Sequence, residues 1–170
     1  MKHKGLALDL GFGEGRDSIF LSQKGFKVRA IENDQNKIKQ FEEKARQLNI
    51  DLTLSDISKV SLEKNTYSLI MAQNVLPFLP NKKEVLETIK KCVDSLSPEG
   101  YFVFSIFGKK DEWNRKKKHM AFLDYEEILR ELDKNPVAIY FKSSEEGYGP
   151  TIKGDIKYWQ IHKFIIEKDK

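Results

Sequence analysis

Short apolar runs alternate along this chain with segments in which apolar residues recur every three or four positions. Runs of the first kind are typical of buried strands, and the second spacing is typical of amphipathic helices. The runs predict strands at about Gly5–Leu10, Lys27–Glu32, Leu52–Leu54, Tyr67–Gln73, Tyr101–Phe107, Val137–Lys142 and Tyr158–Ile166.

Helices are predicted between these strands, and most of them begin at a residue that can cap a helix N-terminus. The first helix follows a glycine-rich turn and ends at Gly25. The other predicted starts are Asp34, Asn81 with Glu84 (a helix through Leu96), and Asp124 with Glu127. A turn at Pro98-Glu99-Gly100 leads into the fifth strand, and a polar loop with Gly147, Gly149, Pro150 and Gly154 joins the last two strands.

The alternation of strands and helices predicts an α/β fold. We expect a Rossmann-like, doubly wound and mostly parallel sheet of about seven strands, with an antiparallel C-terminal strand. The sequence contains no internal repeat and no low-complexity linker. Residues 1–170 are therefore expected to form one domain, with a basic loop at about 108–123.

Composition restricts the environment in which the protein works. Apolar residues make up 39% of the chain, but the longest apolar runs are far too short to span a membrane. The strand pattern starts directly after Met1-Lys2-His3-Lys4, without a visible signal peptide. The single cysteine, Cys92, excludes an internal disulfide, and with only three histidines it makes a metal site unexpected. We expect a cytoplasmic protein without membrane contact or bound metal.

Positive charge is concentrated in one segment. The net charge is +4, and Lys109–His119 alone holds six Lys or Arg residues against two acids. The rest of the chain is therefore neutral overall, so a general nucleic-acid surface is not indicated, although a local basic patch is.

The turn after the first strand has the pattern of a cofactor site. Gly11, Gly13 and Gly15 stand at alternate positions, so a ligand can approach the backbone there and face the N–H groups of the next helix. In the dinucleotide fingerprint the third glycine comes three residues after the second, whereas here Arg16 occupies that position. Asp9, just before the turn, favours a cationic cofactor over a pyrophosphate.

The motif Asp9-Leu10-Gly11-Phe12-Gly13-Glu14-Gly15 resembles motif I of the class I S-adenosylmethionine (SAM)-dependent methyltransferases. The order of elements matches that family over nearly the whole chain, and the likeness is strongest to the small tellurite-resistance-methyltransferase-like group. The segment from Gly149 to Lys168 resembles the terminal strand of that group. Many members carry helices before the first strand that cover the cofactor, so here the site is expected to be more open or covered differently.

The resemblance implies SAM as cofactor, S-adenosylhomocysteine as product, and no metal. It places Asp9 near the methionine end of the cofactor and assigns the ribose hydroxyls to Glu32, which ends the second strand; the alternative is a solvated strand-end acid. In Leu54-Ser55-Asp56-Ile57, the acid would accept from the adenine amine and Ile57 would pack on the ring. The alternative is a capped turn.

Two further positions follow from the same resemblance. Gln73, at the end of the fourth strand, would contact the methionine portion through its backbone. Arg16 would pair with the cofactor's carboxylate, or else is a solvated residue of the first helical turn. Ser68 departs from the family, which usually has an acid there to hold the start of the strand. The full set of predicted cofactor residues is Asp9, Gly11, Phe12, Gly13, Gly15, Arg16, Glu32, Asn33, Asp56, Ile57 and Gln73.

Catalytic residues cannot be named from the sequence. A sulfonium is already activated, so the enzyme needs only to align donor and acceptor and exclude water. His162 fits a core or edge position better than a catalytic one, whereas His119, Tyr148 and Trp113 lie in loops where they could meet substrate. The expected activity is methyl transfer to a small-molecule or soft-anion acceptor by a monomer or homodimer.

Two alternatives remain open. A SAM-binding partner subunit without turnover would carry the same motif I. A nucleic-acid methyltransferase is disfavoured, because Gln73–Phe78 contains no Asn-Pro-Pro-Tyr-type motif. The basic segment Lys109–His119, with Trp113 and Met120 as apolar anchors, is expected either to form a mobile lid that favours an anionic substrate or to be a solvated loop.

Overall fold

The structure is a computed structural model that describes residues 4–170. It contains one seven-stranded sheet with the order β3-β2-β1-β4-β5-β7-β6. The strands are β1 (Leu6–Leu10), β2 (Lys27–Glu32), β3 (Ile50–Leu54), β4 (Tyr67–Ala72), β5 (Leu96–Phe107), β6 (Val137–Pro150) and β7 (Ile156–Lys168). All seven predicted strands are therefore confirmed, although several differ in length.

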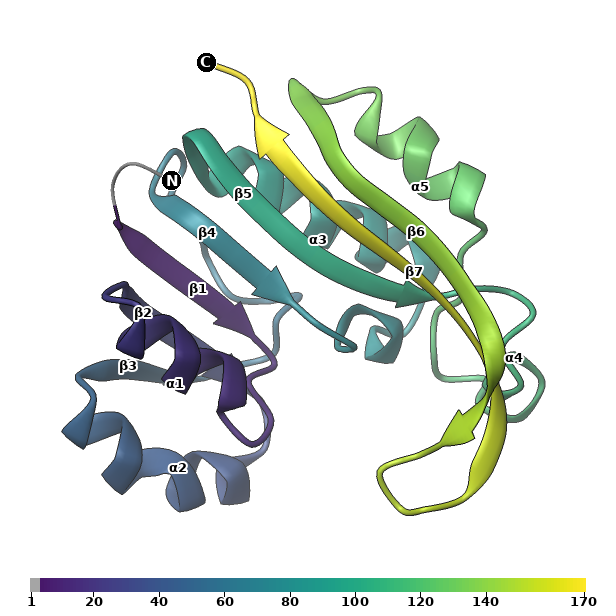
Figure 1. Cartoon of the computed structure of the whole chain (residues 1–170), viewed down its shortest axis with the longest axis horizontal. Helices are drawn as coiled ribbons and strands as arrows, with labels where there is room; N and C mark the ends of the chain where they lie inside the picture. Colours follow the sequence, from purple (N-terminus) through teal and green to yellow (C-terminus); the bar gives the residue numbers. More distant parts are fainter. Residues whose placement is uncertain (1–3) are drawn as a thin grey trace.

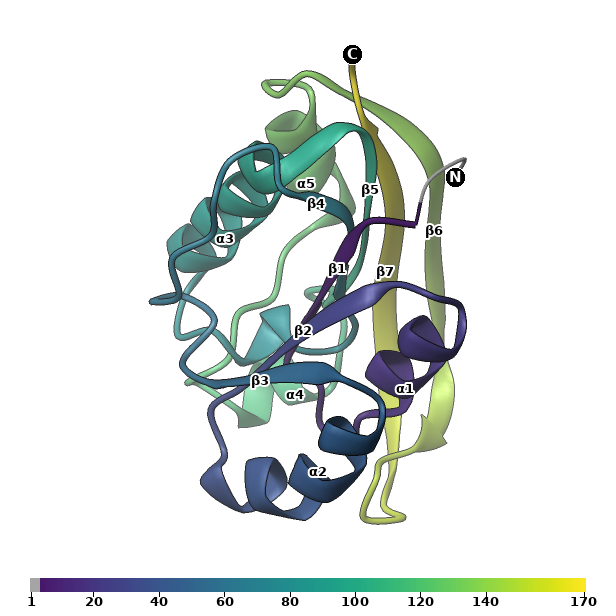
Figure 2. The same ribbon diagram turned by 90° about the vertical axis from the view of Figure 1, so that its left-hand side faces the viewer.

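Helices lie on both faces of the sheet (Figures 1 and 2). The helical elements are α1 (Arg16–Gln23), α2 (Gln35–Gln47), η1 (Leu76–Phe78), α3 (Lys82–Ser95), α4 (Trp113–Lys116) and α5 (Tyr125–Leu132). One apolar cluster, which includes Ala7, Val28 and Phe41, fills the space between α1, α2 and the sheet. A larger cluster, which includes Ile89 and Phe104, lies on the face that α3 and α5 cover.

Strands β1 to β5 are parallel where they pair, and only β7 runs antiparallel to its neighbours. The carboxyl ends of β1 to β5 therefore meet at one edge of the sheet, where ligands bind in folds of this class. The predicted doubly wound sheet with an antiparallel C-terminal strand is confirmed. That strand does not form the edge, because β7 inserts between β5 and β6.

The predicted loop between the last two strands is wrong for much of its length. Strands β6 and β7 form a long hairpin whose pairing runs from Val137↔Lys168 to Pro150↔Ile156. Past Ser143, no residue of β6 is buried and five of seven are exposed, so the sequence shows no apolar alternation there. Only cross-strand pairing reveals that this polar stretch is a strand.

The predicted turn at 98–100 lies inside β5 as an irregularity. Tyr67 pairs with Leu96, and two residues later Leu69 pairs with Tyr101, so the residues between Leu96 and Tyr101 loop out. Glu99 has a positive φ of 60° within this loop. The turn therefore lies where the sequence predicts it, but β5 pairs with β4 both before and after it.

The predicted helix caps are present. The side chain of Asp34 accepts a hydrogen bond from the Asn36 N–H at 2.8 Å, and Asn81 accepts from the Glu84 N–H at 3.0 Å. Asp124 and Glu127 form a reciprocal capping box at the start of α5. Among the described residues, none of the helices is long and apolar enough to cross a membrane.

Candidate functional site

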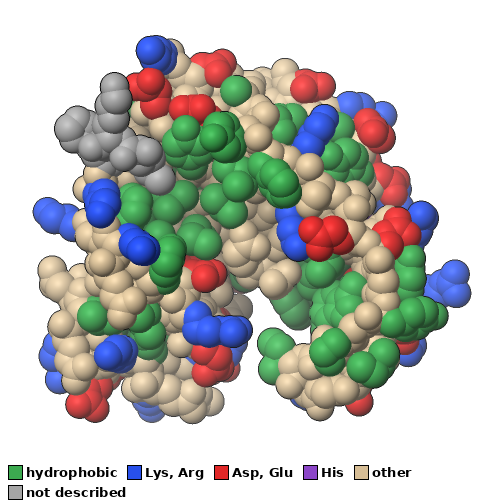
Figure 3. Space-filling model, viewed as in Figure 1, with side chains coloured by type: hydrophobic (Ala, Val, Ile, Leu, Met, Phe, Trp, Pro, Cys, Tyr) green, Lys and Arg blue, Asp and Glu red, His purple; other side chains and the backbone are tan. Residues whose placement is uncertain are grey.

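The candidate site lies where the carboxyl ends of the parallel strands meet. The turn of residues 11–15, between β1 and α1, lies at this edge, and the end of the β6–β7 hairpin lies across from it (Figure 1). A deep notch separates these two parts of the surface in Figure 3. The wall around α1 and α2 shows acidic and basic side chains, and the hairpin wall shows a patch of hydrophobic ones.

The three glycines of the turn have positive φ angles of 70°, 56° and 74°, but each is required for a different reason. A side chain at Gly11 would overlap Val75, and one at Gly15 would overlap the ring of Phe41. At Gly13 the direction of a Cβ meets nothing closer than the Gly11 carbonyl oxygen at 4.0 Å. Gly13 therefore lines open space that a ligand can fill, whereas Gly11 and Gly15 allow close packing.

Glu32 ties the end of β2 to the glycine turn. Its carboxylate accepts hydrogen bonds from the N–H groups of Gly13 (3.1 Å), Asn33 (2.9 Å) and Asp34 (3.3 Å), and the side chain is buried. The interpretation as a solvated strand-end acid is therefore wrong. A carboxylate has about four acceptor positions, so about one remains for a ligand hydroxyl.

Asp9 is buried beneath the turn at the end of β1. It accepts a hydrogen bond from the Ser18 hydroxyl at 2.6 Å, which joins β1 to the first turn of α1. Burial raises the pKa of the Asp9 carboxyl from 3.8 to about 6, although the Ser18 hydrogen bond works in the opposite direction. The sequence analysis missed Ser18; its signal is a hydroxyl on the inward face of a helix, next to the apolar Leu21.

Asp56 begins a turn after β3, and only one of its oxygens is used within the described chain. Oδ1 accepts from the Ser58 N–H at 2.9 Å and from the Ser58 hydroxyl at 3.0 Å, as the capped-turn alternative predicts. Lys91 fixes the same turn by donating to the carbonyls of Ile57 and Val60. The Oδ2 atom of Asp56 makes no hydrogen bond within residues 4–170 and remains available.

Two predicted cofactor residues have side chains that belong to the core. Ile57 is 7% exposed and packs in the larger apolar cluster, and its contact with a ring stays a prediction. Phe12 is buried, and its ring lies 5.1 Å from that of Phe41. A ligand can therefore meet Phe12 only through its backbone.

The segment after β4 is held in an unusual backbone conformation. Asn74 has a φ of 54°, its N–H donates to the Ser105 hydroxyl at 2.8 Å, and that hydroxyl donates to Asn74 Oδ1 at 3.1 Å. This arrangement places Val75 against Gly11. Gln73 is half-buried at the end of β4, on the edge where the glycine turn lies. Ser105 was also missed by the sequence analysis.

The remaining candidates lie on the surface. Arg16 is exposed at the start of α1, and within residues 4–170 it makes no ion pair. Asn33 is exposed next to Glu32. Ser68 donates to the Leu6 carbonyl at 3.2 Å, so it holds the start of β4 against β1 in place of the acid usual in the family.

The start of the basic segment packs on β5 and β7. The backbone N–H groups of Gly108 and Glu112 donate to the carbonyls of Gln160 and Tyr158 at 2.8 and 3.0 Å. Trp113 of α4 packs against Phe107 and the β7 residue Trp159. The segment therefore forms a wall that is built onto the hairpin, and its movement as a lid stays a prediction.

Three of the six basic side chains in this segment form ion pairs within residues 4–170. Lys109 pairs with Asp124 and with Glu127, Lys110 pairs with Glu146, and Lys116 pairs with Glu112. Their acidic partners come from α5, from β6 and from the segment itself. Arg115, Lys117 and Lys118 form no ion pair within residues 4–170, so the expectation that the segment favours an anionic substrate rests on these three and stays a prediction.

His162 lies on β7 and is buried, as the core interpretation predicts. Its Nδ1 lies 2.9 Å from the Ser144 hydroxyl, and its ring centroid lies 5.4 Å from that of Tyr125. Burial lowers the pKa of the imidazole, so it is neutral at neutral pH. His162 thus packs and orients the hairpin.

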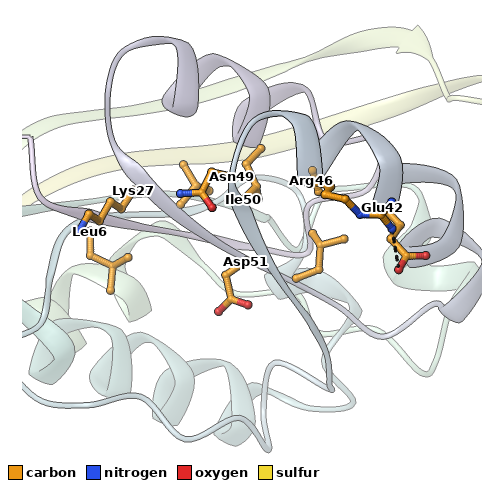
Figure 4. A pocket seen from close by; sticks show the side chains of 10 residues that line it. Leu6, Lys27, Glu42, Arg46, Asn49, Ile50 and Asp51 are labelled. Atoms are coloured by element: carbon orange, nitrogen blue, oxygen red, sulfur yellow. Dashed lines mark ion pairs between the residues drawn. The ribbon is translucent and has the colours of Figure 1, made fainter.

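A hollow of about 570 Å³ lies away from this site (Figure 4). It is lined by the first residues of β1, β2 and β3 (Leu6, Lys27 and Ile50) and by the end of α2. These are the amino ends of the parallel strands, opposite the edge with the glycine turn. The hollow therefore has no part in the candidate site.

Comparisons with known proteins identify a family and relatives of this chain. The model of a family described as "Tellurite resistance protein TehB" matches residues 2–137. A Haemophilus influenzae protein, described as a probable S-adenosyl-L-methionine-dependent methyltransferase TehB, is 31% identical over 144 residues. That match covers 75% of this chain and 50% of the relative, so the chain spans half the length of that relative.

Solved structures show the same fold. The crystal structure of TehB from Haemophilus influenzae gives a TM-score of 0.81 at 21% identity and covers 96% of this chain and 57% of that one. A SAM-dependent methyltransferase from Methanosarcina mazei gives a TM-score of 0.77 at 21% identity and covers 98% and 94% of the two chains.

Proposed function

The chain belongs to the TehB family, and we propose that it is a SAM-dependent methyltransferase acting on a small-molecule or soft-anion acceptor. The observation that carries the proposal is the open space at Gly13, which lies between Glu32 and the N-terminus of α1. A side chain there would fill the space, whereas the neighbouring glycines only permit packing. We take residues 1–170 as one domain that provides this site.

Each polar group at the strand ends has a role toward the cofactor in this proposal. Glu32 offers its remaining acceptor position to a ribose hydroxyl, and Oδ2 of Asp56 accepts from the adenine amine. The backbone around Gln73 faces the methionine portion, and Arg16 is free to pair with its carboxylate. Asp9 acts through Ser18, because it is buried and fixes α1 relative to the turn.

The chemistry requires alignment rather than an acid or base from the protein. The bound SAM supplies a methyl group on a positively charged sulfur, which is already activated for transfer. The chain's own residues hold the donor at the strand ends, while the hairpin wall excludes water from the other side. This wall carries the half-buried Trp113 and Trp159 and the exposed Tyr148, so it offers apolar and aromatic surface to the acceptor. No metal is part of the proposal.

Calorimetry with S-adenosylhomocysteine tests the cofactor assignment. We expect one binding event per chain and none with NADH, because the turn lacks the dinucleotide spacing. Tight NADH binding would overturn the proposal. Mass spectrometry then follows methyl transfer to a panel of thiols, tellurite, selenite and amines. Binding of S-adenosylhomocysteine without turnover of any acceptor would favour the alternative, a partner subunit that kept only the cofactor site.

A further inference from the structure

Three aromatic rings surround the ammonium group of a buried lysine in the hairpin wall. The Nζ atom of Lys157 lies 3.7 Å from the ring centroid of Trp159, 4.3 Å from that of Trp113 and 5.4 Å from that of Phe107. The three rings also contact one another, with centroids 5.3 to 6.1 Å apart. We call this arrangement of Phe107, Trp113 and Trp159 the aromatic box. Aromatic faces attract cations, and boxes of this kind suit methylated ammonium groups.

A carboxylate completes the box. Asp111 is buried and pairs with Lys157, but its position does not depend on that lysine. It also accepts from the Trp113 N–H at 3.0 Å and from the Gln160 N–H at 3.3 Å. A negative charge is therefore fixed behind the rings by the backbone, and it would remain there if another cation replaced the lysine.

Lys157 fits this environment poorly. A lysine ammonium has three N–H donors, and within residues 4–170 it donates only to Asp111. The side chain is 3% exposed, so water does not satisfy the other donors. Burial also lowers the pKa of the Lys157 ammonium. A methylated ammonium has fewer N–H groups to satisfy, so the rings and the carboxylate suit it better than they suit lysine.

The resident lysine lies where the chain can release it. Lys157 is the second residue of β7, directly after the exposed end of the hairpin, where Ile152 and Ile156 are also exposed. The strand register places Phe107 and Trp159 on the same face of the sheet as Asp9, the face that α1 covers over β1. Trp113 and Trp159 are themselves only half-buried, so the box has an open side.

We propose that the aromatic box is a binding site for a methylated alkylammonium group, with Lys157 as an occupant that such a ligand displaces. The site belongs to the hairpin wall and needs no bound cofactor. The inference therefore stands or falls separately from the methyltransferase proposal.

Tryptophan fluorescence of the wild-type protein reports ligand binding in the box, because both tryptophans of the sequence belong to the box. The first titration compares tetramethylammonium chloride with sodium chloride at equal ionic strength. The second compares choline with 3,3-dimethylbutan-1-ol, which has the same shape without the charge. We expect a saturable change with each cation, and only an unsaturable drift with sodium chloride and the neutral alcohol.

Variants show whether the lysine and the ligand compete. Lys157→Ala should tighten tetramethylammonium binding at least about tenfold, and Asp111→Asn should weaken it. Lys163→Ala is the matched control, because Lys163 lies on the same strand but pairs with Glu145 at 2.7 Å outside the box. If the wild type shows no saturable change, the proposal is overturned, even if Lys157→Ala responds; the box then serves only to hold its own lysine. If Lys157→Ala does not fold, the wild-type titration alone decides.

Discussion

Charged side chains on the two walls of the notch have different kinds of partners. On the glycine-turn side, hydroxyls and backbone N–H groups hold the acids Asp9, Glu32 and Asp56. Among these three, only Glu32 forms an ion pair within residues 4–170, with Lys37 at 3.7 Å. On the hairpin side, lysines are paired one by one with carboxylates, as in the pairs Lys157–Asp111 and Lys110–Glu146.

The formal charge of a segment in the sequence is therefore not the charge that the folded site presents after ion pairing. Neutral donors orient the acids of the first wall without cancelling them, so they can attract a cationic and hydroxyl-rich ligand. The second wall includes the segment that carries the formal excess of the chain, and ion pairs neutralise three of the six basic side chains of that segment. Substitutions in the two walls should therefore have different effects on stability and on binding.

The largest effect should come from breaking the buried pair of the hairpin wall. Asp111→Ala removes the acceptor that the Lys157 ammonium shares with the N–H groups of Trp113 and Gln160, so the free energy of unfolding should fall by about 3–5 kcal/mol. Lys110→Ala breaks an exposed pair and should cost about 0–1 kcal/mol. Urea denaturation measures both. Equal losses in the two variants would show that the pairs do not differ as their burial suggests.

The next effect concerns the open space at Gly13. Gly13→Val should weaken S-adenosylhomocysteine binding at least about 100-fold, or about 2.7 kcal/mol, because the side chain fills the space the ligand needs. Gly154→Val is the matched control: Gly154 also has a positive φ and no atom within 4 Å, but it lies at the hairpin end. It should carry similar backbone strain and bind normally by calorimetry. Weak binding in both variants would point to general strain instead.

The acids of the first wall should contribute to binding one by one. Glu32→Ala and Asp56→Ala should each weaken S-adenosylhomocysteine binding by about 1–3 kcal/mol, the range for hydrogen bonds to a charged partner. Glu32→Ala should also lower thermal stability more than Asp56→Ala, because Glu32 is buried and its loss leaves the Gly13 and Asn33 N–H groups without an acceptor. Glu32→Gln retains one acceptor oxygen and should lie between. Wild-type affinity in both alanine variants would remove these residues from the site.

The charge of Asp9 should make cofactor binding depend on pH. The raised pKa of about 6 means that this carboxyl is half protonated near that pH in the ligand-free protein. A sulfonium nearby favours the ionised form, so SAM affinity should rise by up to about tenfold per pH unit between about pH 5 and 6 and level off above. S-adenosylhomocysteine lacks the sulfonium and should show a flatter profile. Identical profiles for the two ligands, measured by calorimetry, would contradict a nearby sulfonium.

The same shift has a consequence for folding. Because the folded-state pKa lies above 3.8, the contribution of Asp9 to stability is present at low pH and is lost as the pH rises through about 6. Asp9→Asn should remove this dependence in urea denaturation.

The smallest effect is expected from the unpaired charges of the hairpin wall. The quadruple variant Arg115/Lys116/Lys117/Lys118→Ser loses one exposed pair, Lys116–Glu112, and a Lys117 cation that lies 5.9 Å from the centre of the Trp113 ring. We expect a stability change of about 0.5–1.5 kcal/mol and little change in the salt dependence of turnover. A clear loss of salt dependence would support the predicted role in attracting anions.

The sequence by itself determined the parts of this protein that depend on local chemistry. The apolar periods located all seven strands, and Asp34, Asn81 and Asp124 marked the starts of their helices. The glycine spacing after β1 predicted the ligand edge of the sheet, because a left-handed turn between a strand and a helix admits few residue types. These features depend on neighbours within a few positions, so a single sequence contains them.

Packing and ion pairs between residues far apart in the sequence became visible only in the tertiary structure. Gly11 packs against Val75 and Gly15 packs against Phe41, whereas Gly13 faces open space. The fold also turned a polar loop into a long hairpin and joined the basic segment to it, through pairs such as Lys157–Asp111 that are 46 positions apart. Burial and ion pairing depend on which segments of the chain meet in space, and the local spacing of apolar residues does not specify those contacts.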